Sequence, residues 1–154
     1  MEKLEKLIEL KKNIDTSSLQ QSYAVKAFDV YSSVNNAAYT QILLGTSPTR
    51  NSSDWACDSS QRFVYNGSTT RQFLIVLSTE AFPVSIGSEL FFRLKINSID
   101  FSPQYISSPW PDTAVRSVTM TWVVQLQKGS TIKLLAKRTV SNITLQNFQF
   151  SVLA

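Results

Sequence analysis

The stretch that decides the fold is SVTMTWVVQLQKGS, Ser117–Ser130. Apolar residues occupy every second position, and threonine or glutamine fills most positions between them. A period of two is typical of a β-strand with one face on a core. We expect an inward set of Val118, Met120, Trp122, Val124 and Leu126, and an outward set of Thr119, Thr121, Gln125 and Gln127. The Lys128–Gly129 pair predicts a turn into the next strand.

Other segments repeat this alternation. SELFFRLKINS, Ser88–Ser98, predicts a strand whose inward residues are Leu90, Phe92, Leu94 and Ile96. QRFVYNG (Gln61–Gly67) and TTRQFLIVLST (Thr69–Thr79) are predicted to form a hairpin, because Asn66–Gly67 suits the positive φ angles of a tight turn. The apolar parity switches between Leu145 and Phe148, which predicts a bulge at Gln146–Asn147.

Two features bound the architecture. The chain has 154 residues, 43% of them hydrophobic, which is the size and composition of one globular domain. SPQYISSPWPD, Ser102–Asp112, holds three of the five prolines and is predicted to be a loop. Many short strands without an alternating helix predict an all-β fold, an antiparallel jelly-roll sandwich of about 8–10 strands with a short N-terminal helix.

The N-terminal stretch MEKLEKLIELKKNI is the one helical pattern in the chain. We expect residues 1–15 to be a helix and residues 16–154 the jelly-roll domain. Leu7, Leu10 and Ile14 lie at the spacing of a coiled-coil seam. The helix would then be a short trimeric coiled coil or an anchor; the alternative is an amphipathic helix packed on its own domain.

The charge pattern disfavours nucleic acid as a partner. The net charge is +4, but Glu2, Glu5 and Glu9 are interleaved with the N-terminal lysines. An arm that neutralises phosphates would be a run of like charge. No apolar run is long enough to span a bilayer, so we expect no membrane insertion.

The residues that carry most enzyme chemistry are missing. The sequence has no histidine, one cysteine and four glycines, which excludes histidine-assisted nucleophiles and glycine-rich phosphate loops. Asp54 and Asp58 share a loop and could share a cation, although turn formation explains them better. We therefore predict no catalytic residue, no metal site and no cofactor, and a protein that is not an enzyme.

The last third of the chain, from Ser117, resembles the end of the tumour necrosis factor and complement-head superfamily. Leu126, the Lys128–Gly129 turn and Phe148–Phe150 stand where those domains have a strand end, a turn and an aromatic C-terminal strand. Ser130 replaces the usual aspartate. The segment from Arg62 to Ser98 looks like the middle of such domains in bacteriophage and large-DNA-virus structural proteins.

This resemblance implies a jelly roll that forms a threefold homotrimer on a virion assembled in the host cytoplasm, as a head fibre or fibre knob. The helix would attach it to a capsid or a fibre shaft. The resembled families bury the aromatic C-terminal strand around the axis, which implicates Phe148, Phe150 and Val152 in the trimer interface. The alternative is that these three side chains fill the sandwich interior.

The protein would contact a glycan or a protein on the host surface through its own loops that carry an aromatic residue. The candidate loops are Thr46–Ser60 and Ser102–Asp112, and the candidate contact residues are Trp55, Tyr105 and Trp110. Two other functions stay open: a carbohydrate-binding module or tail-fibre tip whose aromatics stack on sugars, and a capsid jelly roll that contacts the genome.

Overall fold

The computed structural model of the chain describes residues 2–9, 22–44 and 50–154. Residues 2–9 are helical, and the rest of the described chain is built from strands. The strands are β1 (Tyr23–Val34), β2 (Thr40–Ile42), β3 (Arg50–Asn51), β4 (Trp55–Cys57), β5 (Phe63–Tyr65), β6 (Arg71–Pro83), β7 (Leu90–Ile96), β8 (Ile99–Ile106), β9 (Arg116–Leu126), β10 (Thr131–Arg138) and β11 (Ile143–Leu153). The short strands β3 and β4 lie in a segment predicted to be a loop.

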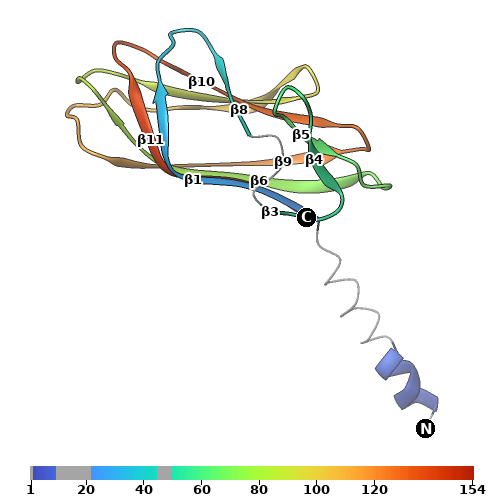
Figure 1. Cartoon of the computed structure of the whole chain (residues 1–154). Coiled ribbons are helices and arrows are strands. Elements are labelled where there is room, and N and C mark those ends of the chain that lie inside the picture. The colour runs from blue at the N-terminus through green and yellow to red at the C-terminus, as the bar shows by residue number, and fades with distance from the viewer. Residues whose placement is uncertain (1, 10–21, 45–49) are drawn as a thin grey trace.

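Two antiparallel sheets face each other as two layers (Figure 1). The five-stranded sheet has the order β3-β1-β11-β6-β9. The six-stranded sheet has the order β4-β5-β10-β7-β8, and β2 pairs with β10 outside that order. Tyr23 pairs with Leu153, so β1 begins and β11 ends at the same end of the sandwich. The predicted antiparallel jelly-roll sandwich is confirmed.

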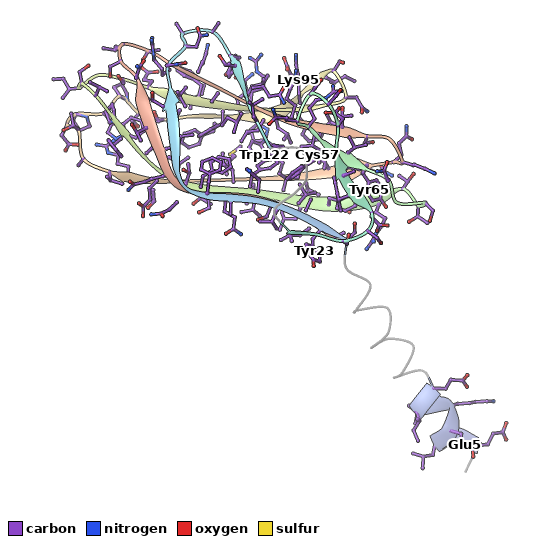
Figure 2. All side chains as sticks on the ribbon, in the orientation of Figure 1. Glu5, Tyr23, Cys57, Tyr65, Lys95 and Trp122 are labelled. Carbon is purple, nitrogen blue, oxygen red and sulfur yellow. The ribbon has the colours of Figure 1, made fainter. Side chains whose placement is uncertain are left out.

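Alternating side chains build the core between the sheets. The predicted inward residues of β7 are all buried, as are those of β9 apart from the partly buried Met120. Successive residues of a strand point to opposite faces, so each strand contributes one row to the interior. Figure 2 shows Trp122 between the layers, with Lys95 and Tyr23 on opposite outer surfaces.

The predicted bulge in the last strand is confirmed. The pairing of β11 with β6 shifts register between Gln146 and Gln149. Asn147 adopts a φ of 46°, in the left-handed region that asparagine tolerates better than most residues. The extra residue restores inward orientation for both Leu145 and Phe148, which are buried.

The predicted hairpin at Asn66–Gly67 is wrong. β5 pairs with β4 and β10, whereas β6 pairs with β9 and β11, so the connection crosses from one sheet to the other. Neither Asn66 nor Gly67 is among the residues with positive φ. Gly67 is required for another reason: a Cβ atom there would overlap the Tyr65 ring.

The predicted loop at Ser102–Asp112 is also partly wrong, because its first five residues belong to β8. Among the strands that the structure describes, β8 is an edge strand that pairs with β7 alone, with a register shift at Phe92–Leu94. Pro103 cannot donate a backbone hydrogen bond, and an edge strand or a bulge is where a sheet tolerates such a residue. The remainder, Ser107–Asp112, does form a connection to β9.

The N-terminal helix is described over residues 2–9, where every side chain is exposed. Glu2 and Lys6 form the expected ion pair, at 3.3 Å. Of the predicted seam, Leu7 is exposed, whereas Leu10 and Ile14 lie outside the described residues. Within the described part of the chain, no helix combines the length and the apolar character needed to cross a membrane.

Candidate subunit interface

The outer side of the five-stranded sheet carries an unusual set of side chains. The inward residues of β6 include Phe73, Ile75 and Leu77, all buried, so Leu74 and Val76 point outward. On β9, Val123 interrupts the outward threonines and glutamines. Outward positions on a solvated sheet are normally polar, so apolar residues at these places need an explanation.

The strand register aligns these outward residues into three rows across β1, β11, β6 and β9. The rows are Tyr23–Leu153–Leu74–Val123, Val25–Ser151–Val76–Thr121 and Ala27–Gln149–Ser78–Thr119. None of the twelve residues is charged. We call this surface the uncharged face.

The first row is the most exposed part of the uncharged face. Val123 is 64% exposed, Leu74 42%, Leu153 41% and Tyr23 36%. Four large apolar side chains in register on four neighbouring strands form a continuous apolar strip. Contiguous exposed apolar surface of this kind marks an interaction site in soluble proteins.

The second and third rows mix apolar and polar side chains and contain no ionised group. Ser151 is buried among its neighbours, and its Oγ accepts a hydrogen bond of 3.0 Å from Gln149 Nε2. A carboxylate first occurs beyond the third row on β6, where Glu80 Oε2 accepts hydrogen bonds from Gln146 Nε2 (2.8 Å) and Asn147 Nδ2 (3.1 Å). The twelve residues of the uncharged face can therefore be covered by a partner without desolvating a charge, and Arg50 of β3, which pairs with Val25, marks the edge of this face.

The prediction that Phe148, Phe150 and Val152 form the trimer contact needs correction. All three side chains are buried in the single chain, inside the sandwich. Phe148 stacks on Phe28 of β1, with ring centroids 4.3 Å apart and planes 1° from parallel. Their positions agree with the alternative interpretation, in which these three side chains fill the interior of the sandwich. The outward neighbours of these residues on β11, Gln149, Ser151 and Leu153, are the ones that lie on the uncharged face.

Trp55 and Trp110, predicted as receptor contacts, are buried as well. Trp55 lies in β4, and its indole nitrogen donates to Ser22 Oγ at 2.8 Å. Trp110 packs in the core and donates to the Ala114 carbonyl oxygen at 3.2 Å. Both residues anchor their segments on the body, so neither can stack on a ligand in this conformation.

Tyr105, the third predicted contact, is half-buried. Its ring packs against Phe92 of β7, with centroids 5.9 Å apart. Burial raises the pKa of its hydroxyl above the usual range, although the positive charge of Arg116 opposes that shift. Of the three predicted contacts, only Tyr105 presents part of its surface to solvent.

The groups that could support chemistry are engaged in structural roles. Burial, together with the neighbouring Asp58 carboxylate, raises the pKa of Cys57 to about 11, so its thiol is protonated at neutral pH. Asp58 forms a turn, as expected: Oδ1 accepts from the backbone of Ser60 and Arg62, and Oδ2 accepts from the Arg62 guanidinium. No three acidic or cysteine side chains in the described segments are grouped to hold a metal ion.

The sequence matches no family model and no curated protein. Solved structures do resemble the fold. Murine APRIL at pH 5.0 has a TM-score of 0.59 and 13% identity, and the match covers 87% of this chain and 98% of that chain. Murine APRIL at pH 8.5 has a TM-score of 0.58 and 11% identity, with the same coverage of both chains. Eiger TNF from S. frugiperda has a TM-score of 0.50 and 9% identity, and the match covers 86% of this chain and 92% of that chain.

This protein has a TNF-like jelly-roll fold. The similar structures belong to the TNF family of cytokine-type proteins, which are not enzymes. At these identities the similarity establishes the fold and leaves the function to be argued from the surface of this chain.

The sequence prediction missed Tyr23, Leu74, Val123 and Leu153. A signal for two of them is present, because Leu74 and Val123 are apolar residues at positions that the alternation assigns to solvent. These residues form one row only because of the order of the strands in the sheet, and no single segment of the sequence indicates that order.

Proposed function

We propose that this chain assembles as a homotrimer through the uncharged face. The strip formed by Tyr23, Leu153, Leu74 and Val123 carries this proposal. Proteins of the TNF fold are typically homotrimers, and an oligomer buries surface that is more apolar and less charged than the rest of the molecule. The uncharged face meets that description.

The opposite surface supports the same choice. The outer side of the six-stranded sheet carries Arg93, Lys95, Lys133 and Lys137, and a subunit contact there would have to desolvate these charges. The uncharged face is therefore the better suited of the two sheet faces to contact a second copy of this chain.

We further infer that the trimer is a structural protein of a virion, a head fibre or fibre knob that decorates the particle and contacts the host. The resemblance of Arg62–Ser98 to bacteriophage and large-DNA-virus structural proteins supports this role. The helix would attach the trimer to a capsid or a fibre shaft. The exposed apolar side chains Leu4, Leu7 and Ile8 are available for that contact.

Solution mass tests the assembly. Light scattering at micromolar concentration should give three times the chain mass of 17.3 kDa. Leu74→Lys places a charge in the centre of the strip and should shift the mass toward that of one chain. Val140→Lys is the matched control, because Val140 is an exposed residue between β10 and β11, and its trimer should persist. A single-chain mass for the unsubstituted protein would refute the proposal.

The virion role is tested separately. Tryptic peptides of this chain should occur in gradient-purified particles from the source, at a constant ratio to the major capsid protein across the particle peak. Their absence from intact particles, in cells that express the chain, would remove the virion role and leave the trimer unaffected.

A further inference from the structure

The outer side of the six-stranded sheet is strongly basic. Arg93 and Lys95 on β7, and Lys133 and Lys137 on β10, are half-buried and stand at the outward positions of their strands, with the buried Leu135 between the two lysines. β7 and β10 are hydrogen-bonded neighbours, and their register places Lys133 directly opposite Lys95. We call these four residues the basic face. Figure 2 shows Lys95 on the surface opposite Tyr23.

The positive charge of the basic face is only partly balanced. Asp100 on β8 lies 3.1 Å from Arg93 Nη1 and 3.7 Å from Lys95 Nζ. Neither Lys133 nor Lys137 forms an ion pair with any residue that the structure describes. Four cations share one paired carboxylate, which leaves an excess of positive charge.

Aromatic rings and an amide hold two of the cations in place. Lys137 Nζ lies 4.7 Å from the ring centroids of both Tyr39 and Phe91. The Arg93 guanidinium lies 4.2 Å from the Tyr39 centroid. With the Gln104 amide oriented to satisfy its neighbours, its oxygen accepts from Arg93 Nε (3.2 Å) and Nη2 (2.9 Å). Side chains that are already ordered lose less entropy when a ligand binds.

This arrangement costs stability in the absence of a ligand. Like charges directly opposite each other on neighbouring strands are destabilising, and Lys133 and Lys95 are such a pair. The fold does not require charge on a sheet surface, because the uncharged face has none in its three rows. The cations are better explained by a binding role than by folding.

We propose that the basic face binds an acidic polysaccharide. The cations lie along two strands, and Lys133 and Lys137 are four residues apart, which corresponds to about 13 Å. That spread suits an extended chain with repeated anionic groups better than one small anion. Duplex DNA is the less favoured polyanion, because the N-terminal lysines alternate with glutamates and provide no like-charge arm that would add phosphate contacts.

This inference rests on the proposed host contact and specifies its surface, the basic face, and its ligand, an acidic polysaccharide. It lies on the sheet opposite the uncharged face, so it stays open in the trimer. Three copies would strengthen a weak contact through multivalency. The two proposals fail separately: a loss of trimer formation lowers valency, whereas a loss of polysaccharide binding leaves the trimer intact.

The test measures binding of the full-length protein to dextran sulfate and to uncharged dextran over a range of salt concentrations. We expect binding to dextran sulfate alone. Lys133→Gln/Lys137→Gln should weaken it on the order of 10-fold and lower its salt dependence by about two released ions. Lys3→Gln/Lys128→Gln is the matched control, because it removes the same charge from exposed residues elsewhere and should bind within about 2-fold of the parent.

Three results would overturn the proposal. One is failure of the parent to bind dextran sulfate at low salt. Another is an equal loss in both double variants, which would assign binding to net charge alone. The third is tighter binding of a duplex DNA fragment than of dextran sulfate, with the same loss in Lys133→Gln/Lys137→Gln, which would make the basic face a nucleic-acid surface. Thermal unfolding of each variant confirms that the comparison is between folded proteins.

Discussion

The indole nitrogen of Trp122 donates a hydrogen bond of 2.8 Å to the carbonyl oxygen of Pro103. Trp122 belongs to β9 in the five-stranded sheet and Pro103 to β8 at the edge of the other sheet, so the bond joins the two layers. Trp122 is also buried in the core. We expect Trp122→Ala to cost about 3–5 kcal/mol of unfolding free energy, through lost burial and a cavity.

Denaturant unfolding measures this cost. Trp122→Phe keeps an aromatic ring but removes the donor, so it should cost less, about 1–3 kcal/mol. Val115→Ala, just before β9 and outside the uncharged face, is the control; its exposed side chain should change stability by about 0.5 kcal/mol or less. A cost below about 1 kcal/mol for Trp122→Ala would mean that the strand faces are exchanged.

Gly67→Ala should destabilise the body because its new methyl group overlaps the Tyr65 ring. Tyr65 is buried, and its hydroxyl donates to the Thr69 carbonyl oxygen at 2.8 Å, so the ring has little freedom to move. We expect a cost of about 1–3 kcal/mol. A double-mutant cycle with Tyr65→Leu should remove most of that cost.

Gly87→Ala provides the contrast. Gly87 has a φ of +85° and no atom within 4 Å of a built Cβ, so only backbone strain opposes the change. The expected cost is about 1–2 kcal/mol, and it should not depend on Tyr65→Leu. If Tyr65→Leu left the cost of Gly67→Ala unchanged, the ring contact would not be the cause.

This contrast shows what the sequence could and could not predict. The alternation in β7 and β9 predicts their buried faces, because side-chain orientation follows from local backbone geometry. The bulge at Asn147 was also predictable, from a parity switch within one strand. An Asn–Gly pair, by contrast, predicts a turn without saying which strands it joins, and here Gly67 leaves room for the ring of Tyr65, which is buried in the core.

The candidate site shows the same limit. Trp55 and Trp110 lie in polar segments, and nothing local distinguishes a buried anchor from an exposed contact. Their burial depends on partners far along the chain, such as Ser22 for Trp55. Likewise, the row from Tyr23 to Val123 exists only once β1, β11, β6 and β9 are neighbours. Both the burial of the tryptophans and the formation of this row depend on contacts between segments that are far apart in the sequence.

Cys57 should react slowly with Ellman's reagent in the native protein. Burial and the Asp58 carboxylate raise its pKa from 9.0 to about 11, which lowers the thiolate population at pH 8 by about 100-fold. Labelling should become fast in denaturant. Because folding raises this pKa, the linked stability is complete below pH 9 and is lost as the pH rises toward 11. Equal labelling rates in native and denatured protein would contradict the assignment.

Deleting residues 1–15 should leave the β-sandwich folded. The described core lies within β1–β11 and the segments that join them, and the three tryptophans are all buried there. The near-UV circular dichroism of those tryptophans and the cooperativity of unfolding should therefore persist. Leu7→Lys is the milder companion variant: Leu7 is exposed, so the substitution should leave the unfolding midpoint of the body unchanged. Loss of the tryptophan signal in the deletion, together with a lowered midpoint in Leu7→Lys, would instead place the helix on the core and remove its proposed role in attachment.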